Sequence, residues 1–179
     1  LDTADERGWT VLSEGLIPLR ALQRVTSEVV LFVCTGNTCR SPMAEAITRA
    51  AIAARKLDQI TVASAGTGAW DGAPVSEGGY LVGLEQGLDL SGHRARLLTR
   101  EIVRDADLIL TMSGHHLARV AELGGEHKVH MLGSYAGREG DRAEVTDPYG
   151  SDLTAYRATY AELEELIGAV MSRLAGPVR

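Results

Sequence analysis

One stretch of sequence decides the fold of this chain: Val29-Val-Leu-Phe-Val-Cys34-Thr-Gly-Asn-Thr-Cys-Arg40-Ser-Pro-Met-Ala-Glu-Ala46. It contains, in order, an apolar run typical of a β-strand, a short polar loop and the start of a helix. Ser41 is a candidate N-cap of that helix, and Pro42 suits its first turn because proline has no N–H to leave unpaired there. A strand, a tight loop and a helix in this order direct loop N–H groups and the positive end of the helix dipole to one point. We therefore expect an anion-binding loop here.

The side chains of this loop indicate which anion it binds and what reaction follows. A cysteine beside a helix N-terminus and an arginine is expected to rest as a thiolate, so Cys34 is a candidate nucleophile. The planar guanidinium of Arg40 matches two phosphate oxygens, and Ser41 is placed to donate a hydrogen bond to the sulfur. These residue types predict phosphoryl transfer through a phosphocysteine. The alternative is that Cys34 is a small buried residue at a strand end and Arg40 a surface charge.

Composition bounds the kind of protein. A chain of 179 residues, 45% of them hydrophobic, suits one domain with a well-buried core. No apolar run is long enough to cross a bilayer, and the net charge of −6 argues against nucleic acid or an anionic membrane as the main partner. The only cysteines, Cys34 and Cys39, share one loop, so we expect no disulfide framework and a reducing, cytoplasmic compartment.

Apolar runs alternate with helical patterns along the rest of the chain. After the first strand we predict strands over residues 60–65, 108–112 and 129–132, and helices over residues 42–55, 75–86, 115–123 and 153–174. Strands that alternate with helices pair in parallel through right-handed crossovers. The sequence therefore predicts an α/β fold: a four-stranded, parallel, doubly wound sheet with helices on both faces. The phosphate-binding loop is expected after strand one, at the carboxyl ends of the strands.

A general acid is needed as well, because the group that leaves phosphorus departs poorly without a proton. Asp147 is the best candidate, since it lies in a long loop and Pro148 restricts how that loop presents the carboxylate. Asp-Pro pairs are also common where turns begin, so this pair alone is weak evidence.

From residue 29 to about residue 174, the chain resembles the low-molecular-weight protein tyrosine phosphatase family, including its bacterial protein-arginine-phosphatase branch. The strongest matches are Cys34 to Glu45 and Asp147 to Gly150. The resemblance implies a phosphatase domain over residues 29–179 that acts on phosphorylated proteins or peptides. The thiolate and the arginine imply chemistry that needs no cofactor or metal. The resemblance also implies that Asp147 is the general acid. The phosphate-binding loop then comprises Thr35, Gly36, Asn37, Thr38, Cys39, Arg40 and Ser41.

Supporting roles follow from the same resemblance. Asn37 is expected to hold the loop backbone, with Ser64 and His93 as partners, because the family has these residue types in the corresponding stretches. Taken alone, His93 would more often be a structural histidine. The remaining histidines form no recognisable metal-binding set with either cysteine. Cys39 either fills space behind the loop or traps an oxidised Cys34 as a disulfide, and the resemblance favours this redox role.

The substrate is the open question. In tyrosine-specific members the position of Thr38 usually carries a larger aliphatic residue, whereas the arginine branch carries threonine in the same string. A small hydroxyl-bearing side chain suits a planar guanidinium, which Asp147 could also bind. Trp70 and Tyr149 are candidate aromatic walls for a phenol ring, but aromatic faces accept guanidinium too. We favour phosphoarginine over phosphotyrosine. We rank below both of them the hydrolysis of small phosphorylated metabolites and a regulatory module that binds phosphate without catalysis.

Residues 1–28 match nothing in this family. The run from Gly8 to Pro18 resembles the tail of threonylcarbamoyl-adenylate synthase domains, which would make it the remnant of a neighbouring domain. The alternative is an ordinary extension that packs Trp9, Leu16 and Ile17 against the domain. The role of this extension is left open.

Overall fold

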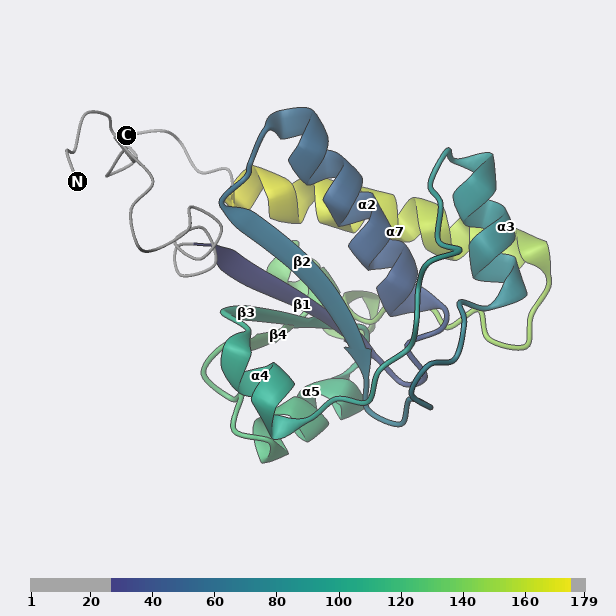
Figure 1. Ribbon diagram of the computed structural model, residues 1–179. Coiled ribbons are helices and arrows are strands. Elements are labelled where there is room, and N and C mark those ends of the chain that lie inside the picture. The colour runs from purple at the N-terminus through teal and green to yellow at the C-terminus, as the bar shows by residue number, and fades with distance from the viewer. Residues whose placement is uncertain (1–26, 175–179) are drawn as a thin grey trace, which may run out of the picture.

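The computed structural model describes residues 27–174. Its centre is a four-stranded sheet of β1 (Glu28–Cys34), β2 (Ile60–Gly66), β3 (Leu108–Thr111) and β4 (Val129–Met131), in the order β2-β1-β3-β4. Every neighbouring pair is parallel. The predicted α/β fold with a parallel sheet and the loop after strand one is confirmed (Figure 1).

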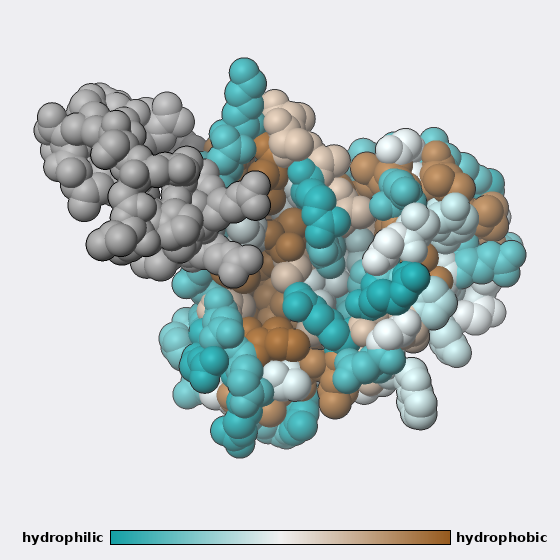
Figure 2. All heavy atoms as spheres, viewed as in Figure 1, coloured by the Kyte–Doolittle hydropathy of each residue, from teal (hydrophilic) through white to brown (hydrophobic). Residues whose placement is uncertain are grey.

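Helices cover both faces of this sheet because its strands are apolar on both sides. Along β1, Val30 and Phe32 contribute to one core, and Leu31 and Val33 contribute to the other. The first core lies under α2 (Arg40–Arg55) and α7 (Leu153–Leu174), and the second under α4 (Arg100–Asp105) and α5 (Gly114–Glu122) (Figure 1). On the face shown in Figure 2, apolar residues lie between these helix layers and hydrophilic side chains project around them.

The remaining helices are α3 (Glu77–Glu85), α6 (Leu132–Tyr135) and a 3-10 turn over Gly140–Ala143. Glycines weaken the helical pattern of α3, and two of them have packing reasons. A β-carbon on Gly78 would lie 2.5 Å from the Tyr156 ring, and one on Gly83 would lie 2.3 Å from Leu90. The short helix α4 was not predicted; the Thr99 side chain accepts a hydrogen bond from the Ile102 amide at its start.

The start of α2 corrects one prediction. The helix begins at Arg40, so the N-cap position belongs to Cys39, which forms no side-chain cap bond. Ser41 is therefore not the N-cap but a residue of the first turn. Its hydroxyl is turned away from the helix amides, towards Cys34 and Asn37.

The register between β1 and β2 fixes where the loop leaves the sheet. Cys34 ends β1 opposite Gly66, which ends β2. A β-carbon on Gly66 would lie 2.4 Å from the Thr35 carbonyl oxygen and 2.8 Å from the Asn37 nitrogen. Glycine at this position therefore lets the end of β2 support the loop directly.

Most of the predicted extension, residues 1–26, lies outside the described residues, including Trp9, Leu16 and Ile17. The described chain starts immediately before β1, whose first residue is Glu28. Within residues 27–174, no helix combines the length and apolar character needed to cross a membrane.

Candidate active site

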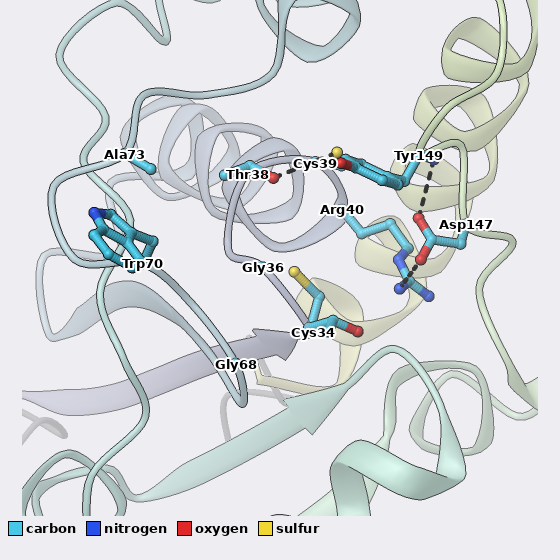
Figure 3. Close-up of a pocket in the computed structure, with 11 residues that line it drawn as sticks. Cys34, Gly36, Thr38, Cys39, Arg40, Gly68, Trp70, Ala73, Asp147 and Tyr149 are labelled. Atoms are coloured by element: carbon cyan, nitrogen blue, oxygen red, sulfur yellow. Dashed lines mark hydrogen bonds and ion pairs between the residues drawn. The ribbon is translucent and has the colours of Figure 1, made fainter.

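A pocket of about 330 Å³ opens at the carboxyl edge of the sheet. It is bordered by the loop after β1, the segment after β2 and the segment that precedes α7 (Figure 3). The predicted nucleophile, the arginine, the acid and the substrate-selecting residues all line it. The lining residues are Cys34, Thr35, Gly36, Thr38, Cys39, Arg40, Gly68, Trp70, Ala73, Asp147 and Tyr149.

Cys34 lies at the base of this pocket and is only 2% exposed. Its sulfur is 3.0 Å from the Ser41 hydroxyl oxygen. That oxygen already accepts a hydrogen bond of 2.9 Å from the Asn37 side-chain amide. The hydroxyl hydrogen of Ser41 is therefore available to the sulfur, an arrangement that stabilises a thiolate.

Asn37 itself has an unusual, left-handed backbone conformation, with φ of 53°. Its amide nitrogen also donates to the Ser64 hydroxyl at 2.8 Å, and its side-chain oxygen accepts from the Arg96 backbone N–H at 2.9 Å. The backbone donor fixes which end of the Asn37 amide is oxygen. His93 completes the set, since its Nε2 lies 2.7 Å from the Asn37 carbonyl oxygen. Four interactions thus hold one residue of the loop.

Two members of this framework were not identified from the sequence. Glu45 accepts a 2.5 Å hydrogen bond from Ser64, and the Arg96 guanidinium donates to the Ser64 carbonyl oxygen at 2.6 Å. Glu45 lies one helical turn after Ser41, a spacing that could have drawn attention to it. Nothing local signals Arg96, which reaches the loop only through the fold.

Arg40 is almost fully buried and points at the mouth of the pocket. Its Nη1 donates to the Val145 carbonyl oxygen at 3.1 Å. Its Nη2 donates to Asp147 Oδ2 at 2.5 Å, the pair that Figure 3 shows. The other Asp147 oxygen accepts from the Tyr149 backbone N–H at 3.1 Å. The carboxylate is thereby held at the pocket entrance with 46% of its side chain exposed.

The aromatic residues lie on opposite sides of the loop in Figure 3. Trp70 is 83% exposed and Tyr149 is 77% exposed, so neither is part of the core. In the same view Thr38 lies between Trp70 and Tyr149. Its hydroxyl oxygen is 3.6 Å from the Cys39 sulfur. The predicted selecting residues therefore surround a single entrance.

Cys39 belongs to the loop and lines the pocket, but it is only 5% exposed, and its sulfur lies 3.3 Å from the Tyr156 hydroxyl. Burial, reinforced by this bond to Cys39, raises the pKa of Tyr156 to about 12. Both cysteines are free thiols, and Figure 3 shows their sulfur atoms pointing in different directions.

Two histidines for which the sequence suggested no role lie near the site, and one of them contacts the loop. His116 is fully buried, and its Nε2 lies 2.8 Å from the Thr35 hydroxyl. His115 is connected to His116 through the side chain of Ser113. Among residues 27–174, no group of three or more histidine, cysteine or acidic side chains is arranged to hold a metal ion.

The fold and the arrangement of the site define an α/β protein phosphatase. The chain belongs to the low molecular weight phosphotyrosine protein phosphatase family, whose model matches residues 29–178.

Both tyrosine phosphatases and arginine phosphatases are similar to this chain. The probable low molecular weight protein-tyrosine-phosphatase EpsP of Ralstonia nicotianae is 35% identical over 147 residues, which covers 82% of this chain and 96% of EpsP. A protein-arginine-phosphatase of Bacillus subtilis is 37% identical over 147 residues, covering 81% of this chain and 95% of the relative. A crystal structure of the tyrosine phosphatase from T. tengcongensis superimposes with a TM-score of 0.76 at 39% identity, covering 82% and 99% of the two chains.

Proposed function

We propose that this enzyme removes phosphate from phosphoarginine side chains of proteins through a phosphocysteine on Cys34. The observation that carries the proposal is the position of Thr38 and Asp147 in the pocket that holds Cys34. A small side chain at Thr38 leaves room for a planar guanidinium, and the Asp147 carboxylate can bind that cation.

In the first step the Cys34 thiolate attacks phosphorus and the P–N bond breaks. Arg40 and the backbone N–H groups from Thr35 to Arg40 hold the three equatorial phosphoryl oxygens. None of these N–H groups donates to another residue between positions 27 and 174, which supports this role. The nitrogen that leaves takes the bonding electron pair and receives a proton from Asp147, so that arginine departs as guanidinium.

In the second step a water molecule attacks the phosphocysteine. Asp147, now a carboxylate, accepts a proton from this water, the S–P bond breaks, and Cys34 leaves as a thiolate. The Ser41 hydroxyl, 3.0 Å from the sulfur, stabilises the anion in both steps. Inorganic phosphate departs and the thiolate is regenerated. Both steps require a reduced Cys34, which fits the expected cytoplasmic location.

Phosphotyrosine is the second candidate, and the exposed rings of Trp70 and Tyr149 favour it. A phenol ring could lie between the two aromatic side chains, as in a stacked aromatic cluster. The same rings would also accept a guanidinium through cation–π contact, so they do not oppose phosphoarginine. The choice therefore depends on Thr38.

The experiment compares kcat/KM on a phosphoarginine peptide and a phosphotyrosine peptide of the same sequence. The parent enzyme should prefer phosphoarginine, and Thr38→Ile should shift the ratio towards phosphotyrosine by about tenfold or more, because one bulky side chain can alter binding by about 1–3 kcal/mol. Thr38→Ser is the matched control and should keep the parental preference. A parent that prefers phosphotyrosine would overturn the substrate proposal while leaving the thiolate mechanism intact.

The same peptides test the alternative that this protein binds phosphate without catalysis. Cys34→Ser and Asp147→Asn should each abolish turnover, whereas a protein that only binds phosphate would show no turnover in its parental form. The complete set of Cys34, Arg40, Ser41 and Asp147 supports an active enzyme.

A further inference from the structure

A chain of hydrogen-bonding side chains leads from the protein surface to the phosphate-binding loop. His115 is exposed on α5, and its Nδ1 lies 3.0 Å from the Ser113 hydroxyl oxygen. The same oxygen lies 2.6 Å from His116 Nδ1, and His116 Nε2 lies 2.8 Å from the Thr35 hydroxyl. Thr35 follows the nucleophile directly and lines the active-site pocket. The chain therefore connects a surface imidazole with the hydroxyl group of a residue that lines the site.

The tautomer of His116 decides in which direction the hydrogen bonds of this chain donate. Burial, followed by the charges of His115 and Arg40, lowers the pKa of His116 to about 3. The ring is therefore neutral at physiological pH and carries one N–H and one bare nitrogen. If Nδ1 holds the hydrogen, Nε2 must accept from Thr35; if Nε2 holds it, that nitrogen donates to Thr35.

The protonation of His115 selects between these directions. A protonated His115 donates from Nδ1 to Ser113, which then gives its own hydrogen to His116 Nδ1. His116 Nε2–H in turn donates to Thr35, and the Thr35 hydroxyl hydrogen is free to point into the pocket. When His115 is neutral with a bare Nδ1, every bond reverses and Thr35 donates to His116.

We propose that Thr35, His116, Ser113 and His115 form a relay in which protonation of His115 releases the Thr35 hydroxyl as a donor to an anion in the phosphate-binding loop. His116 and Ser113 are positioning residues, because they act through Thr35 and do not contact the anion. In the proposed function this anion is the phosphoryl group of the substrate. The identity of the anion therefore rests on the function proposed above.

The charged groups around His115 come from several segments. A surface hollow that includes His115 is also lined by Arg40 of α2, Asp141 of the 3-10 turn, and Glu144 and Asp147 of the following loop. Arg119 lies one turn further along α5, where it pairs with Glu122. Histidine is the side chain whose charge ordinarily changes near neutral pH.

The direct test is a nitrogen-detected NMR titration of the histidine rings from about pH 8 to about pH 5.5, in the unmodified protein. As His115 becomes protonated, the hydrogen of His116 should move from Nδ1 to Nε2 while the His116 ring stays neutral. In His115→Gln the His116 ring should keep one tautomer over the whole range. An unchanged tautomer in the parent, or uptake of a second proton by His116, would overturn the relay.

The second test measures the affinity for sulfate, which keeps its charge of −2 over this pH range. Sulfate is titrated at constant ionic strength against the loop amides of the parent, Thr35→Val and Thr35→Ser. The advantage of the parent over Thr35→Val should grow about ten- to hundredfold as His115 becomes protonated, the range expected for one hydrogen bond to an anion. Thr35→Ser should behave as the parent, because it keeps the hydroxyl group.

The outcomes separate the relay from the proposed function. Equal pH dependence of sulfate binding in the parent and in Thr35→Val would overturn the release of Thr35. If sulfate fails to bind the loop at all, the phosphate-binding role fails and the release to an anion fails with it. The tautomer titration still decides the relay of hydrogen bonds in that case.

Discussion

Arg40 and Asp147 form an ion pair at the mouth of the pocket, with Nη2 2.5 Å from Oδ2. The residue expected to bind the phosphoryl group thus holds the residue expected to protonate the leaving group. A phosphoryl group that enters the loop competes with Asp147 for the same guanidinium. We therefore expect substrate binding and release of the acid to be coupled through the Arg40 side chain.

Arg40→Lys tests this coupling. A lysine ammonium cannot reach the Val145 carbonyl oxygen, Asp147 and a phosphoryl group in the fork geometry of a guanidinium. We expect kcat/KM to fall by about 10²-fold or more, the usual cost of removing a donor from a preorganised anion site. The exposed Arg55→Lys on the same helix should be near parental in activity. Near-parental turnover of Arg40→Lys would contradict the role given to the loop.

Asn37 offers a way to separate backbone strain from hydrogen bonding. Asn37→Ala removes the side-chain bonds to Ser41, Ser64 and the Arg96 amide and leaves φ at 53°. Asn37→Gly removes the same bonds but tolerates that φ. We expect Asn37→Ala to lower the free energy of unfolding by about 2–4 kcal/mol. The loss in Asn37→Gly should be about 1 kcal/mol smaller than the loss in Asn37→Ala. Denaturant unfolding measures both, and equal losses would mean that strain is negligible.

Gly66 should resist substitution because a β-carbon there meets the backbone of the loop. Gly66→Ala would force the Thr35 carbonyl and the Asn37 nitrogen to move, so both the unfolding midpoint and kcat should fall. We expect a loss of about 2 kcal/mol or more. Gly168→Ala is the control, since nothing lies within 4 Å of the added carbon. If Gly66→Ala were as stable and active as the parent, the loop would not depend on this close approach.

Cys39 should protect the nucleophile against oxidation. Peroxide converts the Cys34 thiolate to a sulfenic acid; attack by the Cys39 thiolate then releases hydroxide and forms a disulfide that a thiol reductant can reverse. We expect Cys39→Ser to lose activity to peroxide and to recover much less after treatment with the reductant. Recovery as complete as in the parent would show that Cys39 only fills space, in contact with Tyr156.

His116 should make folding stability depend on pH. The folded protein holds this ring neutral down to about pH 3, whereas the unfolded chain takes up the proton near pH 6.5. Stability from this residue is therefore present above pH 6.5 and declines as the pH falls towards 3. The parent should be more stable than His116→Gln at neutral pH. That difference should shrink by about 1.4 kcal/mol per pH unit as the pH falls below 6.5 towards 3, as measured by denaturant unfolding. A constant difference would refute this assignment.

The sequence reveals most of the sheet because the strands are short apolar runs that need no distant partner to be recognised. Cys34, Arg40 and Ser41 are likewise visible because they lie within one loop. The sequence predicted two roles for the Ser41 hydroxyl, a helix cap and a donor to the sulfur, and only the contact with the sulfur is present, because Asn37 donates to the same oxygen. His116 and Thr35 are 81 positions apart, and only the packing of α5 behind the loop brings them together. The short helix α4 is similarly decided by tertiary contacts, because six residues form a helix poorly alone.

The exposure of Trp70 and Tyr149 has a consequence for how this enzyme could diverge. Cys34, Arg40 and the Asn37 and Ser41 side chains that support the loop are buried, so most changes among them would also destabilise the loop. The two aromatic side chains at the entrance contribute little to the core. Substitutions of Trp70 and Tyr149 can therefore change the substrate preference with little loss of stability, while the buried residues of the loop stay the same.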